Sequence, residues 1–167
     1  EHLDRSSVAA RLEACGRVCY KSEDKISEDS AIPFVTRIAA HGHNSVLEMA
    51  VVSFRLRCHP DKTQELLCCQ PKYLVIDTLV DGLLITGSIR AFRELYLLYP
   101  ENSLVNDLVL TLVATLPYLF DAIFDLAKAQ ERDAGTEITK LSLAEIDQLP
   151  VELHRRHRFV TVRFIVN

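Results

Sequence analysis

The sequence predicts one α+β domain, in which helices flank a small mixed or antiparallel sheet. The first observation is strict alternation of apolar and polar side chains over residues 51–58, which is typical of a half-buried strand. The second is helical spacing of apolar residues in several longer segments, the longest being residues 103–130. The third is size: 167 residues, 49% of them hydrophobic, suffice to bury a core without disulfides or metals.

The N-terminal third is predicted to be helical. Ser6 or Ser7 can cap a helix that runs to about Tyr20, with Cys15 and Cys19 as small core residues. The charged stretch KSEDKISEDS reads as a loop, and a second helix follows over residues 29–41, which Gly42 can end. HNSVLEMA then reads as a short turn or the start of a helix.

The middle of the chain is predicted to hold the sheet. Val52, Phe54, Leu56 and Cys58 face one side of the first strand, whereas Ser53, Arg55 and Arg57 face the other. KYLVID and residues 83–86 are two further strand candidates. Gly87-Ser88 opens a helix, IRAFRELYLL, which Pro100 ends.

The C-terminal part combines a long apolar stretch with shorter elements. Pro117 should kink or split the helical stretch over residues 103–130, which serves either the core or a subunit contact. ERDAGTEITK reads as a linker, and Ser142 with Glu145 fits a capping box for a short helix. Residues 158–166 alternate as a strand, whose FVTVRF repeats the pattern of VVSFRL in the first strand.

Composition excludes several classes of function. The net charge of −4 argues against a general binder of polyanions such as nucleic acids. The longest nearly apolar run, residues 108–120, is shorter than the ~20 residues of a membrane-spanning helix. Five cysteines without a CxxC pair indicate a reducing, cytoplasmic setting, and we expect no metal. Because the sequence begins with Glu1 and stops in an apolar run, we expect residues 1–167 to be a single domain that is either a fragment or the ordered part of a longer chain.

The densest polar constellation is HGHNSVLE, at the junction between a helix and a strand. Such a junction exposes amides and side chains in a fixed geometry, which suits a phosphate or a heterocycle. His43 can donate a hydrogen bond, Ser45 can cap or bind a phosphate oxygen, and Glu48 can accept from a hydroxyl or amide. A plain helix stop with surface histidines is the alternative.

At this segment the chain resembles the flavin-dependent thymidylate synthases. GHNSVLEMAVVSFRL is similar to their Gly-His-x-Ser-x-x-Glu-His segment and the strand that follows it. ACGRVCYKSEDKI resembles an upstream Cys-Tyr segment, and TGSIRAFRELY resembles a late Asn-Ala-Arg-Ser element that opens a helix. The resemblance implies a sheet flanked by helices with a long helical hairpin. It also implies FAD held between subunits of a homotetramer.

The resemblance assigns residues to cofactor binding. His43, Ser45 and Glu48 match positions that contact or support the flavin. In the late element Arg90 matches the arginine, Ser88 replaces the asparagine and Glu94 lies where a polar flavin neighbour is usual. Without the resemblance, the arginines at positions 90 and 93 read as a solvated helix face.

The chain also departs from the family. Met49 replaces a usual His, and Tyr99 stands where an Arg normally meets the uracil ring. The Arg-His-Arg signature is missing after residues 51–58; HRRHR at residues 154–158 precedes a strand and reads as a solvated basic loop. Arg156 and Arg158 within it could instead contact the substrate phosphate. The repeated strand pattern suggests a rearranged layout, with the signature loop beyond Asn167.

Three functions are therefore open. The first is reductive methylation of dUMP to dTMP with methylenetetrahydrofolate, NADPH and FAD, in which no cysteine nucleophile is needed. The second is a non-catalytic relative that keeps the fold, which Met49 and Tyr99 favour. The third is a helical interaction module without a cofactor. The catalytic residues are not identified by the sequence.

Overall fold

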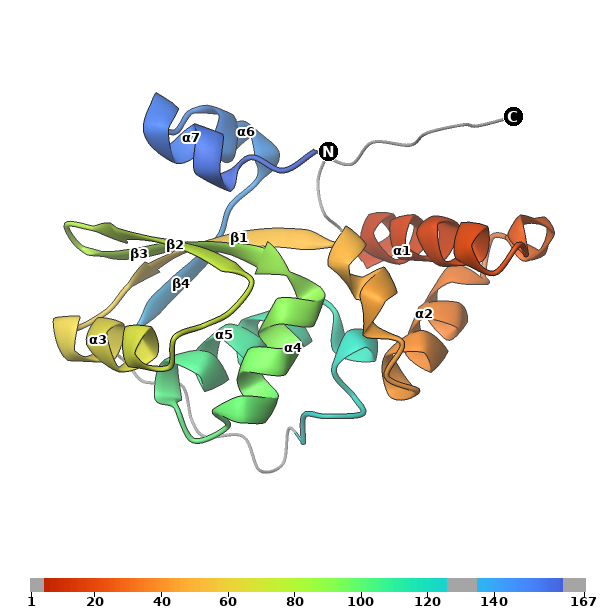
Figure 1. The fold of residues 1–167 in the computed structure, drawn as a ribbon, viewed down its shortest axis with the longest axis horizontal. Coiled ribbons are helices and arrows are strands. Elements are labelled where there is room, and N and C mark those ends of the chain that lie inside the picture. Colours follow the sequence, from red (N-terminus) through yellow and green to blue (C-terminus); the bar gives the residue numbers. More distant parts are fainter. Residues whose placement is uncertain (1–4, 126–134, 161–167) are drawn as a thin grey trace.

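A computed structural model describes residues 5–125 and 135–160 of the chain. Its centre is a four-stranded antiparallel sheet in the order β2-β3-β1-β4 (Figure 1). The strands are β1 (Val51–Arg57), β2 (Leu74–Leu79), β3 (Gly82–Ser88) and β4 (Glu137–Lys140). The predicted α+β class is confirmed, and the sheet is antiparallel throughout.

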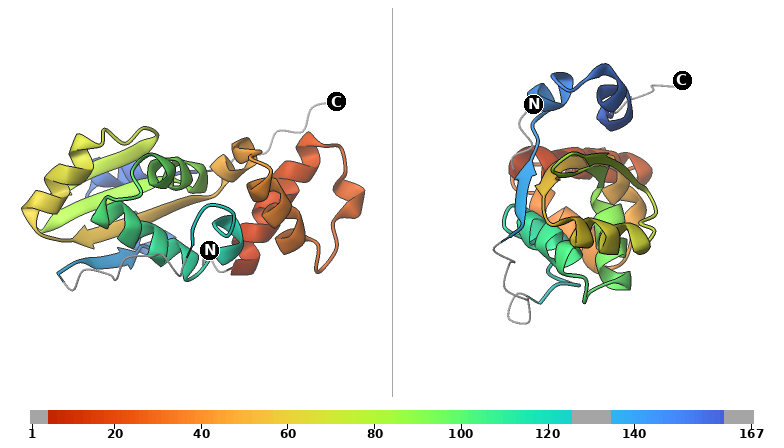
Figure 2. Two further views of the ribbon diagram at one scale, coloured as in Figure 1. Left: turned by 90° about the horizontal axis from the view of Figure 1, so that it is seen from below. Right: turned by 90° about the vertical axis from the view of Figure 1, so that its left-hand side faces the viewer.

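Helices lie on both faces of the sheet and beside one end of it. The pair α1 (Arg5–Cys19) and α2 (Ala31–Ala40) lies beyond one end of β1, joined through the short 3₁₀ helices η1 (Glu23–Lys25) and η2 (Asn44–Met49). One face is covered by α3 (Pro60–Cys68), α4 (Ile89–Leu98) and α5 (Ser103–Val113), followed by η3 (Pro117–Leu119). The opposite face carries α6 (Leu143–Asp147) and α7 (Val151–His157), as the right-hand view of Figure 2 shows.

The main core fills the space between the sheet and the helices on the α4 side. The predicted inner side chains of β1, Val52, Phe54 and Leu56, are buried there, and Phe54 meets Phe92 of α4 edge to face at 5.6 Å. The predicted inner residues of α2, Phe34, Val35 and Ile38, are buried as well. The alternation in β1 and the helical spacing in α2 therefore identified real core positions.

A second, smaller core holds α6 and α7 on the opposite face. Leu84 of β3, Leu141 and Ile146 are buried together there. The predicted capping box is present: the Ser142 hydroxyl accepts from the Glu145 amide, and the Glu145 carboxylate accepts from the Ser142 amide. This face explains why Ser53, predicted to face solvent, is only 3% exposed.

The long helical stretch predicted over residues 103–130 is shorter in the structure. Helix α5 ends at Val113, the chain then forms η3 from Pro117, and residues 126–130 lie outside the described part. Proline removes a backbone donor and restricts the preceding residue, so the helix cannot continue through it. The apolar side chains around the break are buried in the main core: Leu104, Val105, Leu108, Val109, Leu112, Leu116, Tyr118, Leu119, Phe120 and Phe124.

Two other local predictions were wrong. Part of the expected linker ERDAGTEITK forms β4, which pairs with β1 so that Phe54 lies opposite Lys140. The HRRHR motif is mostly helical, since α7 extends through His157, and that histidine is buried. Residues 158–160 of the expected C-terminal strand are irregular, and its remainder lies outside the described residues.

The cysteines do not form the small core pair that their spacing suggested. Cys15 is half-buried and Cys19 is exposed. Burial, together with the neighbouring Cys19, raises the pKa of the Cys15 thiol and so disfavours its reactive thiolate. Within residues 5–125 and 135–160, no three His, Cys, Asp or Glu side chains are grouped to hold a metal.

Candidate functional site

Two junctions at the same end of the β1–β3 pair bring Glu48 and Arg90 together. In the antiparallel register Val51 lies opposite Ser88, and the Ile89 amide donates to the Ala50 carbonyl at 2.8 Å. The chain enters β1 from η2, which carries Glu48, and leaves β3 into α4, which carries Arg90. Strand pairing thus joins two segments that are 42 residues apart in the sequence.

Arg90 is held between two carboxylates. Its Nη1 donates to Glu48 Oε1 at 2.5 Å, and its Nε donates to Glu94 Oε1 at 2.6 Å. Hydrogen bonding to Glu94, followed by that carboxylate's charge, raises the pKa of Arg90, so the guanidinium stays charged. These three side chains together carry one net negative charge.

Helix α4 orients Arg90 because the helix is fixed on both sides of this residue, by a cap at Ser88 and by the contacts of Arg93. The Ser88 hydroxyl caps the helix by accepting from the Ala91 amide at 3.2 Å. One turn further, Arg93 is 3% exposed rather than solvated as predicted. Its guanidinium donates to the Ala39 carbonyl of α2 at 3.0 Å and to the Leu119 carbonyl of η3. Arg90 and Glu94 lie on the neighbouring, partly exposed side of the same helix.

A cavity of about 400 Å³ opens at this cluster. Its lining combines the polar side chains of Glu48, Ser88 and Arg90 with Val51, Gly87, Ala91 and two aromatic rings, Tyr73 and Phe159. Both rings have free surface, since Tyr73 is 76% exposed and Phe159 is 45% exposed. The site thus offers aromatic walls beside hydrogen-bond donors and acceptors, which is the usual composition of a pocket for a heterocycle.

His43 and Ser45 are not part of this cavity. Neither occurs among the described residues that line it, and both are exposed. His43 meets the Tyr20 ring edge to face, with centroids 6.3 Å apart. Gly42 precedes them with a φ of 73°, a left-handed conformation that glycine adopts without strain and that ends α2 as predicted. Of the six predicted cofactor residues, the structure brings together Glu48, Ser88, Arg90 and Glu94.

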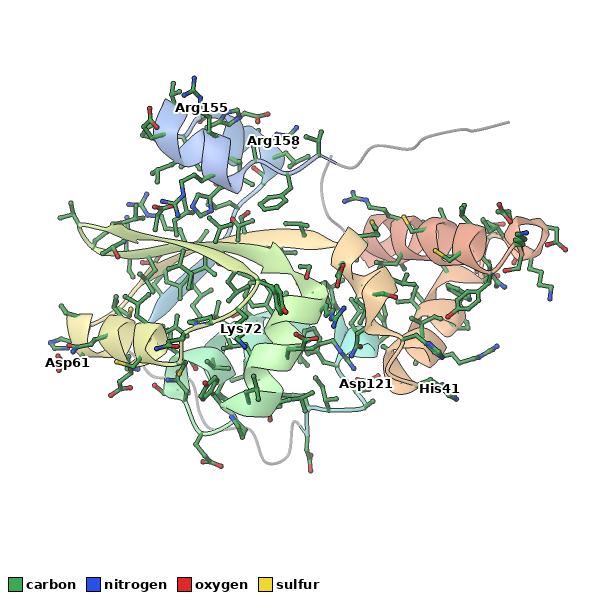
Figure 3. The ribbon with its side chains drawn as sticks, viewed as in Figure 1. His41, Asp61, Lys72, Asp121, Arg155 and Arg158 are labelled. Carbon is green, nitrogen blue, oxygen red and sulfur yellow. The ribbon has the colours of Figure 1, made fainter. Side chains whose placement is uncertain are left out.

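The two arginines predicted to meet a phosphate lie elsewhere and are paired with acids. Arg156 on α7 donates to Asp77 of β2 at 2.5 Å, and Arg158 donates to Asp147 of α6 at 2.9 Å. Hydrogen bonding from Arg158 lowers the pKa of Asp147. Figure 3 places Arg155 and Arg158 in the helical layer of α6 and α7, away from α4 on the other side of the sheet.

Met49 and Tyr99, the two positions at which the chain differs from the family pattern, lie apart from the Arg90 cluster. Met49 is 42% exposed and lines a second cavity on the α6–α7 side. Tyr99 ends α4 at the opposite terminus from Ser88. A helix of ten residues is ~15 Å long, so Tyr99 cannot reach the same group as Ser88.

The residues at the cavity fit the ring system of FAD. Tyr73 and Phe159 can pack against a planar ring, the Arg90 guanidinium can donate to its carbonyls, and Glu48 can accept from its N–H. The diphosphate is not provided for: among the described lining residues Arg90 supplies the positive charge, and two carboxylates already neutralise it. The cavity therefore suits the ring, and other parts of an assembly would have to hold the phosphates.

Some residues were missed by the sequence reasoning. Tyr73 lies in the turn before β2 with a φ of 63°, and no spacing signal connects it to Ser88 or Arg90. His157 was grouped with a basic loop, although it is buried against β2 and β3. Ser53 and Thr86 face each other on paired strands, and these two hydroxyls in the sheet were the signal that a polar partner such as His157 packs against them.

Comparison with known proteins agrees with the resemblance in the N-terminal part of the chain. Residues 3–67 match the family model of the thymidylate synthase complementing proteins, the flavin-dependent thymidylate synthase family. The matched segment includes α1, α2, η2 and β1, and ends before Ser88 and Arg90. No curated protein and no solved structure matches the chain at a significant level. No helix in the described parts of the chain is long and apolar enough to cross a bilayer.

Proposed function

Given a thymidylate synthase-like relationship over residues 3–67, we propose that this chain binds FAD and takes part in reductive methylation of dUMP to dTMP. The co-substrates are methylenetetrahydrofolate, which gives the carbon, and NADPH. The protein acts in the cytoplasm as a homo-oligomer, a tetramer by resemblance. The observation that carries the proposal is the contact between Glu48, inside the matched segment, and Arg90, beyond it, at one cavity.

The residues at this cavity would bind and orient the flavin ring. Arg90 donates hydrogen bonds from a position fixed by Glu48 and Glu94, so its guanidinium is preorganised before the ring arrives. Tyr73 and Phe159, which line the cavity, would pack against the ring and limit its contact with water. FAD, when bound, supplies the redox chemistry that side chains cannot perform.

His43, Ser45, Arg156 and Arg158 remain proposed contacts rather than members of this cavity. The exposure of His43 and Ser45 is compatible with a role toward a neighbouring protomer, because a site shared between subunits needs groups that project outward. The same reasoning applies to Arg156 and Arg158, whose contact with the substrate phosphate would require exchange of their present carboxylate partners.

Flavin uptake is the first test of the proposal. The purified chain is titrated with FAD and followed by flavin absorbance and fluorescence. We expect saturable binding, and Arg90→Gln should weaken it at least tenfold, while Arg37→Gln on the exposed surface of α2 should not. A chain that takes up no FAD would contradict the proposal and favour the helical interaction module.

A non-catalytic relative is the second candidate. Met49 and Tyr99 favour it, because both replace family side chains and neither lies at the Arg90 cluster. Tritium release from labelled dUMP, with NADPH and methylenetetrahydrofolate supplied, distinguishes the two. Flavin binding with tritium release supports the synthase, and flavin binding without release supports the non-catalytic relative.

A further inference from the structure

Phe159 reaches the Arg90 cavity from a part of the chain that packs on the other face of the sheet. It follows the end of α7 by two residues, and α6 and α7 lie on the face opposite α4 (Figure 1). Its side chain lines both the Arg90 cavity and the second cavity, of about 250 Å³, on the α6–α7 side. The position of α7 therefore decides whether Phe159 forms one wall of the proposed flavin site.

One carboxylate of the sheet holds the end of α7. Asp77 of β2 accepts from Arg156 Nη1 at 2.5 Å and from His157 Nε2 at 2.7 Å, so it binds two consecutive residues of the helix. A carboxylate accepts from the Nε2 hydrogen of a neutral or a protonated imidazole, so this contact does not depend on the charge of His157. The Thr86 hydroxyl of β3 bonds the other ring nitrogen at 2.7 Å.

Apolar packing contributes little at this end of α7. His157 is the one buried residue of the helix, Leu153 is partly buried against the small core, and Val151 is 61% exposed. Arg158 donates to Asp147, but this carboxylate belongs to α6 in the same layer and does not join α7 to the sheet. The attachment of residues 156 and 157 to the sheet is therefore concentrated on Asp77, with Thr86 beside it.

We propose that Asp77 is a positioning residue: by anchoring the end of α7 to β2, it places Phe159 at the wall of the Arg90 cavity. Ligand binding and the docking of α7 are then coupled, because a ring that packs against Phe159 favours the docked helix and the docked helix favours the ring. The inference rests on the proposed function for the identity of this ligand, FAD. The placement of Phe159 by Asp77 does not depend on FAD.

The first experiment measures the position of residue 159 without any ligand. The chain contains no tryptophan, so Phe159→Trp introduces a single indole at the cavity wall. In this background Asp77→Ala should raise acrylamide quenching of the indole about twofold, because Phe159 is 45% exposed and a chain end that is no longer tied down becomes fully exposed. Asp81→Ala is the matched control: Asp81 also accepts from two side chains, but these are Arg55 and Arg57 of β1.

The second experiment measures the coupling by hydrogen exchange, with Phe159 unchanged. The amides of α7, such as that of Arg158, which donates to the His154 carbonyl, should exchange about tenfold faster in Asp77→Ala, as expected from the loss of about one hydrogen bond. Wild-type exchange rates in α4 would show that the variant is folded. Saturating FAD should slow exchange in α7 of the wild-type chain, and Asp77→Ala should bind FAD more weakly, by roughly fivefold or more.

The possible outcomes separate this inference from the proposed function. Equal quenching of the indole in the Asp77→Ala and Asp81→Ala backgrounds would overturn the placement of Phe159 by Asp77. Equal FAD affinities of the wild-type chain and Asp77→Ala, with exchange in α7 unaffected by FAD, would overturn the coupling. A wild-type chain that binds no FAD would refute the proposed function, while the quenching experiment would still decide whether Asp77 positions residue 159.

Discussion

Arg93 gives the sharpest prediction on stability, because it joins three elements from a buried position. Its guanidinium donates to Ala39 in α2 and to Leu119 in η3, and it lies 5.9 Å from the Phe120 ring centroid. Burial lowers the pKa of Arg93, whose guanidinium contacts among the described residues are two carbonyl oxygens and a ring and include no carboxylate. We consider the substitution Arg93→Met, which keeps an unbranched apolar stem in place of the aliphatic part of arginine and removes the guanidinium with its donors.

The magnitude follows from what the substitution leaves unpaired. The Leu119 carbonyl loses its donor in a residue that is 0% exposed, at a cost of about 1–3 kcal/mol. The Ala39 carbonyl keeps the Gly42 amide at 3.5 Å, so its loss is smaller. Methionine recovers part of this cost, because the desolvated guanidinium and its unpaired Nε are removed. We therefore expect Arg93→Met to reduce the free energy of unfolding by about 2 kcal/mol.

Urea unfolding followed by circular dichroism measures this loss. Arg37→Met, on the exposed surface of α2, is the matched control and should change the free energy of unfolding by less than about 0.5 kcal/mol. If Arg93→Met is as stable as the control, the guanidinium does not fix α4 against α2 and η3. The account of how Arg90 is oriented would then fail.

Two further predictions concern particular backbone and capping sites. Gly82→Ala should lower the melting temperature markedly and reduce the free energy of unfolding by at least about 2 kcal/mol, because the new Cβ would lie 2.0 Å from the Leu56 carbonyl oxygen at a φ of 150°. The Ser142 hydroxyl and amide lower the pKa of Glu145, so this carboxylate contributes stability above its unfolded pKa and loses it as pH falls through the lower folded value. Ser142→Ala removes the hydroxyl and keeps the amide, so it should reduce that acid-side decline, as measured by unfolding at a series of pH values; an unchanged decline would assign it to other groups.

Local patterns predicted those parts of the fold in which one periodicity dominates. Alternation located β1 because its inner side chains are all large and apolar, and the Ser142–Glu145 spacing located α6. The end of α2 was predicted because Gly42 has a conformation that other residues adopt less readily. In these cases the neighbouring residues alone decide the structure.

Other features depend on contacts that the sequence does not display. Residues 137–140 form a strand only because β1 has a free edge beside them. Ser53 and His157 are buried because α7 folds back over the sheet, and Arg93 is buried because α2 and η3 supply carbonyls. In the candidate site, the resemblance located Glu48 and Arg90, whereas Tyr73 became part of it through the pairing of β2 with β3.

The central claim, that Glu48 and Arg90 act together in holding a flavin, is tested most directly by a double-mutant cycle on FAD affinity. Dissociation constants are measured for the wild-type chain, Glu48→Gln, Arg90→Gln and the double variant. We predict that each single variant binds FAD more weakly and that the double variant binds no worse than Arg90→Gln, because the two side chains form one unit. Independent, additive losses, or affinities that none of the substitutions change, would contradict the account.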